Sequence, residues 1–123
     1  MIVDPACNIT QGFCSAVLGG TRLQLRIGPG VSALKPFPIQ VRAEGVDKEK
    51  VRNVIVSYSM KGMDMGPNRT TLKPTTRMQW EGSSVLPVCT SGRSDWLAEV
   101  QLIEDKRLLS ARFAFTLKGP MAQ

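Results

Sequence analysis

The sequence predicts an all-β fold, a sandwich of about seven antiparallel strands in a single domain that covers residues 1–123. Apolar and polar residues alternate with a period of two through six short stretches, which is typical of strands with one buried face, and a seventh short strand is expected before them. Turn signals rich in Gly and Pro separate these stretches. Only "VDKEKV", residues 46–51, is compatible with a helical turn. A small barrel is the alternative arrangement of the same strands.

The first three strands are expected within the first 44 residues. A short strand precedes "RLQLRI", in which Leu23 and Leu25 alternate with arginine and glutamine, and "IQVRAE" repeats the pattern around Val41. A register shift of one residue would turn each apolar set toward solvent, so the apolar positions define the core face. The expected ranges are 15–18, 22–27 and 39–44.

The other four strands follow the same alternation. In "NVIVSYSM" the apolar side chains of Val56 and Tyr58 share a face, and in "RMQWEG" Met78 and Trp80 do so. "DWLAEVQL" and "ARFAFTL" complete the set, and the four expected ranges are 53–60, 77–82, 95–102 and 111–117. The predicted core includes Leu23, Leu25, Val41, Val56, Tyr58, Trp80, Val100, Phe113 and Phe115.

Composition excludes several classes of function. The net charge is +6, but the basic residues are spread along the chain without a block of four, so we expect no nucleic-acid partner. The chain has no histidine, which excludes imidazole-based catalytic triads, and no carboxylate pair has acid–base spacing, so we expect no enzymatic activity.

The sequence contains no apolar run of the roughly 20 residues that a transmembrane helix needs. The start "MIVDPACNIT" lacks the basic and apolar regions of a signal peptide. If the protein is exported, we expect its signal or anchor to have been removed and Met1 to be an added start residue.

Three cysteines permit one disulfide in three pairings. Cys7–Cys14 closes the shortest loop and is the favoured pairing, which an oxidising compartment would support. Cys89 would then be a free thiol, either a soft metal ligand or a buried apolar residue. Pairing of Cys89 with Cys7 or Cys14 stays open.

The segment "SMKGMDMGP", residues 59–67, contains Met60, Met63 and Met65 among turn-forming Gly and Pro. Thioethers in a Met-x-Met pattern suit a soft ion such as Cu(I), and the absence of histidine leaves sulfur as the donor. The sequence therefore predicts a Cu(I) site formed by Met63 and Met65, with Cys89 or Met60 as a third ligand and Trp80 nearby as a cover. The alternative is that these methionines fill gaps or form an adhesive surface.

The block from residue 57 to residue 103 resembles the YtkA-like and FixH-like group of bacterial domains. The group's pattern is a Met-rich segment, an aromatic-Gly strand and a Gly followed by a strand-opening Trp. The corresponding residues here are Met63, Met65, Gly66, Leu72, Trp80, Gly82, Gly92 and Trp96. The resemblance implies an immunoglobulin-like β-sandwich that faces the periplasm, exported or membrane-tethered, with a role in copper handling or cytochrome oxidase maturation. This chain lacks the membrane helix of FixH-like proteins.

Two functions compete at this point. The first is a periplasmic domain that binds or delivers Cu(I), with a membrane protein such as an oxidase or a copper transporter as its partner. The second is a structural or interaction module whose Met-rich edge docks on a protein partner. Converging sulfur atoms would favour the first function, and methionines spread over an exposed apolar patch would favour the second.

Overall fold

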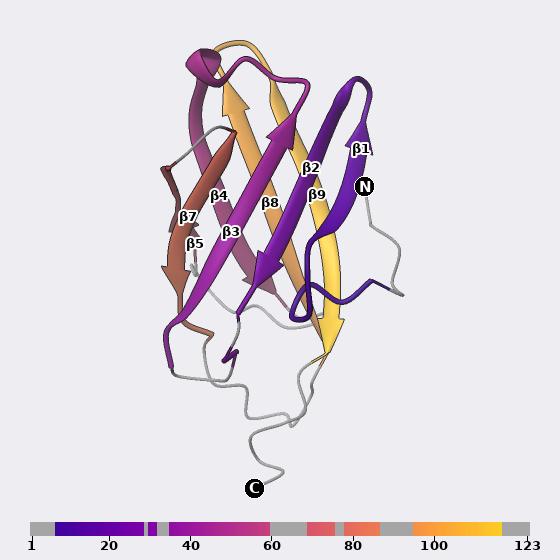
Figure 1. Ribbon diagram of the computed structural model, residues 1–123, viewed down its shortest axis with the longest axis vertical. Helices are drawn as coiled ribbons and strands as arrows, with labels where there is room; N and C mark the ends of the chain where they lie inside the picture. The colour runs from indigo at the N-terminus through magenta and orange to yellow at the C-terminus, as the bar shows by residue number, and fades with distance from the viewer. Residues whose placement is uncertain are drawn as a thin grey trace, which may run out of the picture.

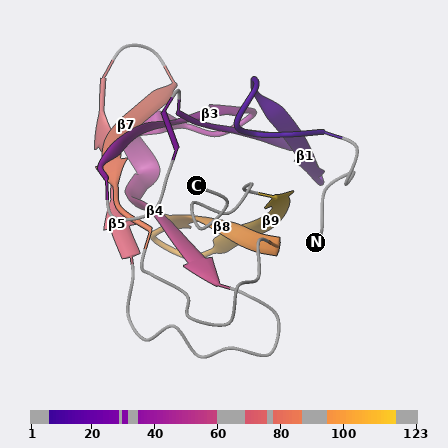
Figure 2. The ribbon, with the colours of Figure 1, turned by 90° about the horizontal axis from the view of Figure 1, so that it is seen from below.

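The computed structural model describes residues 7–28, 30–31, 35–59, 69–75, 78–86 and 95–116. Within these ranges nine strands form two antiparallel sheets that pack face to face, which confirms the predicted sandwich. Figure 1 shows the strands running along the long axis, and Figure 2 shows the two layers from below. We call the two ends of the sandwich upper and lower as they stand in Figure 1.

The two sheets have the strand order of an immunoglobulin-like fold. The first sheet has the order β1 (Cys14–Leu18), β2 (Thr21–Ile27), β3 (Phe37–Glu44), β7 (Gln79–Ser84), β6 (Lys73–Pro74). The second has the order β5 (Arg69–Thr71), β4 (Val51–Ser59), β8 (Asp95–Glu104), β9 (Leu108–Thr116). Strands β2, β3, β7 and β6 correspond to immunoglobulin strands A, B, E and D, and β4, β8 and β9 to C, F and G. Strand β1 is an addition at the edge.

All seven predicted strands are present, and the structure adds the short strands β5 and β6. Three and two residues are too few to produce a recognisable alternation. The predicted helical turn is the 3₁₀ turn η1 (Lys48–Lys50), and Asp47 Oδ1 caps it by accepting a hydrogen bond of 3.0 Å from Glu49 N. Strand β7 begins two residues later than predicted, because Met78 has a left-handed backbone with φ 53°.

The core lies between the inner faces of the two sheets. All nine predicted core residues are buried, with at most 4% of any side chain exposed. Each full burial of a Leu, Val or Phe side chain contributes about 1.5–3 kcal/mol. Burial of these side chains therefore drives folding, and the alternation in the sequence places one apolar face of each long strand in this layer.

One side of the sandwich is closed by contact between β5 and β7, which belong to different sheets and lie side by side in Figure 2. The hydroxyl groups of Thr70 on β5 and Ser84 on β7 are 2.7 Å apart. Gly82 allows the approach, since a Cβ there would lie 2.6 Å from Leu72 Cδ2. The polar pair and the small residue together hold the sheets in register at this side.

Candidate functional site

The predicted sulfur ligands Met60, Met63, Met65 and Cys89 lie outside the described residues. The strand ends that flank their segments are described. Strand β4 ends at Ser59, and β8 begins at Asp95. Because Ser59 pairs with Leu97 across the two strands, both ends lie at the lower end of the sandwich (Figure 1).

Four aromatic side chains pack together in the core at the lower end of the sandwich. The rings of Phe37 and Tyr58 are 6.1 Å apart between centroids, and Tyr58 and Phe115 are 6.4 Å apart, both edge to face. Trp96 stacks on Phe115 at 6.3 Å. Such geometries add about 0.5–1.5 kcal/mol per pair beyond burial. The strand ends that flank the Met-rich and Cys89 segments are therefore fixed by a rigid apolar cluster.

Trp96, rather than the predicted Trp80, is the tryptophan at this end. Trp80 is the second residue of β7 and pairs with Val41, whereas Ser84 at the other end of β7 pairs with Phe37. Four residues of strand separate Trp80 from the lower end, which is about 13 Å. Because the methionines lie outside the described residues, the predicted cover by Trp80 stays a prediction.

Tyr58 contributes a buried hydroxyl to the same region. Burial raises the pKa of Tyr58 to about 12, and a hydrogen bond with Ser84 opposes that rise. The hydroxyl of Ser84 in turn lies 2.7 Å from that of the half-buried Thr70, so three hydroxyl-bearing residues from β4, β5 and β7 form a polar cluster between the sheets. At neutral pH the phenol is uncharged, so the cluster joins the sheets and supplies no base.

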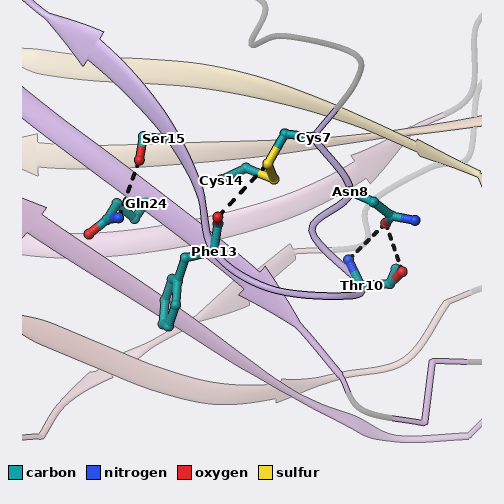
Figure 3. The surroundings of a disulfide bond; sticks show 7 residues. All are labelled: Cys7, Asn8, Thr10, Phe13, Cys14, Ser15 and Gln24. Atoms are coloured by element: carbon teal, nitrogen blue, oxygen red, sulfur yellow. Dashed lines mark hydrogen bonds between the residues drawn. A yellow bond between two sulfur atoms is a disulfide. The ribbon is translucent and has the colours of Figure 1, made fainter.

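The disulfide Cys7–Cys14 is present, as predicted, with a Cα–Cα distance of 5.9 Å (Figure 3). Inside its loop, Asn8 Oδ1 accepts hydrogen bonds from the Thr10 backbone N (2.9 Å) and hydroxyl (2.7 Å), which builds a local turn. Cys7 Sγ lies 3.8 Å from the Phe13 carbonyl oxygen. This contact is not a hydrogen bond, because a disulfide sulfur has no proton to donate.

The loop is also anchored to the core. Ile9 is fully buried, and its carbonyl oxygen accepts a 2.9 Å bond from Ile27 N at the end of β2. The chain has three cysteines, so this pairing leaves Cys89 as the remaining one.

Within the described residues, no group of three or more His, Cys, Asp or Glu side chains lies close enough to hold a metal ion. Some of the charged groups there pair on the surface, as Arg52 does with Asp105 at 3.0 Å and Arg112 with Glu99 at 3.6 Å. The guanidinium of Arg52 holds the pKa of Asp105 below its usual value.

Comparisons with known proteins give no match: no protein-family model, no curated protein and no solved structure is significantly similar to this chain. The resemblance to the YtkA-like and FixH-like group therefore stays a prediction. No helix in the described residues is long and apolar enough to cross a membrane.

Proposed function

We propose that this chain is an exported bacterial β-sandwich domain, periplasmic or membrane-tethered, that binds Cu(I) through Met63 and Met65, with Cys89 or Met60 as a third ligand. The observation that carries the proposal is the position of the strand ends. The Met-rich segment leaves β4 at Ser59, the Cys89 segment enters β8 at Asp95, and these ends belong to paired strands.

Chain length is compatible with convergence of the sulfur atoms. Met63 is four residues from Ser59 and Cys89 is six residues from Asp95. Extended chain spans at most about 3.3–3.6 Å per residue, so the two segments can reach at most about 14 and 22 Å from their anchors. Paired residues on neighbouring strands are only about 5 Å apart. The two segments can therefore meet without any rearrangement of the sheets.

The donor chemistry suits the ion. A chain without histidine offers thioethers and one thiol that is outside the disulfide, and soft sulfur ligands select Cu(I) over zinc or Cu(II). The disulfide is consistent with an oxidising compartment. We propose a membrane protein such as an oxidase or a copper transporter as the recipient of the ion.

The test is a Cu(I) titration against a chromophoric chelator with a Met63→Leu, Met65→Leu double variant, which keeps side-chain volume and removes both thioethers. We expect the double variant to lose at least about tenfold in affinity, whereas Met78→Leu, a thioether outside the segment, leaves affinity unchanged. Equal Cu(I) binding by the double variant and the parent would exclude this site. The Met-rich edge would then be assigned to docking on a protein partner, the competing function.

A further inference from the structure

A depression of about 440 Å³ lies on the outer face of the first sheet, at its upper end, opposite to the end where β4 stops at Ser59. Gln24 and Arg42 point outward because the residues beside them in β2 and β3 are buried. Its volume is in the range of small-molecule sites. We call it the outer-face depression, and its lining residues are Gln24, Arg42, Ala43, Glu44, Gly45, Val46 and Met78.

The guanidinium of Arg42 is held from two sides. Its Nε donates a 3.1 Å hydrogen bond to Gln79 Oε1, and its Cζ lies 4.1 Å from the centroid of the Phe13 ring. Gln79 is fixed in turn by its own 2.6 Å bond to Glu81 Oε2. A cation that is already ordered loses less side-chain entropy when it binds a ligand.

The charge of Arg42 is not paired with a carboxylate of any described residue. In the described part of the chain, Arg22, Arg52, Arg107 and Arg112 each have a carboxylate partner, and Arg42 has none. The acid in the lining, Glu44, is paired with Arg22 at 3.5 Å. The bond to Gln79 uses one of the five guanidinium donors, so a forked pair on the Nη nitrogens suits a carboxylate.

Met78 is an apolar residue of the lining and has a strained backbone conformation. Its φ of 53° is a conformation that favours glycine, yet the residue is a methionine whose carbonyl oxygen accepts a 3.0 Å bond from Ala43 N. Backbone strain of this kind concentrates at binding sites. Val46, half-buried, adds a second apolar contact to the lining.

We propose that the outer-face depression binds a small carboxylate that carries an apolar group. The carboxylate pairs with the Nη donors of Arg42, and the apolar group packs against Met78 and Val46. Phe13 is the last residue inside the loop closed by Cys7–Cys14, so the disulfide helps to keep the aromatic ring over Arg42. The site does not depend on copper binding.

The test uses N-acetyl-leucine as the probe and N-acetyl-leucinamide as its uncharged control. Binding is monitored by the chemical shifts of backbone amides in NMR. The ionic strength is kept low, because an exposed ion pair is then screened least. We expect saturable shifts at Arg42, Ala43, Val46 and Met78 with the acid only. Equal shifts with the amide would overturn the proposal. Acetyl-alanyl-alanyl-leucine distinguishes two sources of the same chemistry: tighter binding than N-acetyl-leucine assigns the site to a peptide carboxyl terminus, and equal binding assigns it to a small acid.

Two matched variants test whether Arg42 supplies the positive charge that binds the carboxylate. Arg42→Gln removes it, and Arg26→Gln removes another outward arginine of the same sheet that has no carboxylate partner in the described residues and lies outside the depression. We expect Arg42→Gln to weaken binding of N-acetyl-leucine at least about tenfold and Arg26→Gln to leave it within about twofold. Unchanged binding by Arg42→Gln, or equal losses in both variants, would overturn the proposal, and the amide spectrum of each variant confirms its fold.

Discussion

The hydroxyl oxygens of Thr70 and Ser84 lie 2.7 Å apart and join the two sheets of the sandwich at the side where β5 meets β7. Ser84 is buried, and its hydroxyl lowers the pKa of the neighbouring Tyr58. The pair therefore tests how much a single buried polar contact between sheets stabilises this fold.

Thr70→Val keeps the shape of the side chain and removes its hydroxyl, which leaves Ser84 with one partner fewer in the interior. We expect the free energy of unfolding to fall by about 1–2 kcal/mol. Urea denaturation measures it, and Thr71→Val on the exposed neighbour is the control, with a change within about 0.5 kcal/mol. Equal effects of the two substitutions would contradict a specific role for the hydroxyl pair.

Tyr58 makes stability depend on alkaline pH. Its pKa is raised to about 12 by burial, above its value in the unfolded chain, so its contribution is fully present below pH 10 and is lost as pH rises through 12. A shift of about two units corresponds to about 2–3 kcal/mol.

Tyr58 is the only tyrosine in the chain, so the near-ultraviolet absorbance of tyrosinate reports it alone. We expect the titration midpoint of the folded protein to lie clearly above that of the protein in urea. Lysines titrate in the same range, so Tyr58→Phe is the reference for stability. The free energy of unfolding of the parent, relative to that of the variant, should fall as the pH rises above 10. Coincident midpoints in folded and unfolded protein would contradict the burial of the phenol.

Gly45 connects β3 to η1 with a φ of 82°, and a Cβ at this position would collide with the Gly20 carbonyl oxygen. Both effects oppose any side chain. We expect Gly45→Ala to lower the free energy of unfolding by more than about 2 kcal/mol.

Gly12→Ala is the matched control, since a Cβ at Gly12 meets nothing within 4 Å. We expect it to be close to neutral in the same thermal or urea denaturation. A neutral Gly45→Ala would show that the β3–η1 connection can shift away from Gly20.

The disulfide Cys7–Cys14 closes a loop with a sequence separation of 7 and anchors the buried Ile9. Reduction should lower the free energy of unfolding by about 2–3 kcal/mol in the chain-entropy account. Thiol counting on unfolded, unreduced protein should find one free cysteine, and none in Cys89→Ser. A count of three in the parent would mean that the bond does not form.

Much of the fold follows from local pattern. Alternation with a period of two was enough to predict six of the seven expected strands and nine core residues, because a strand that packs on one face must place every second side chain inward. The predicted turn at 46–51 and the short disulfide loop also depend on neighbours in sequence. The alternation is wrong at Met78, where a turn with positive φ replaces the expected start of the strand.

Only the tertiary structure decided which distant segments meet. The Thr70–Ser84 pair, the Phe13 ring over Arg42 and the contact of Gly82 with Leu72 join residues from different strands or loops. No periodicity encodes these contacts, because the order of strands in a sheet is set by the packing of the whole core and not by the composition of any one strand. The sequence alone determined that Arg42 points outward, and the folded chain determined that it lies beside the Phe13 ring and donates a hydrogen bond to the Gln79 amide oxygen.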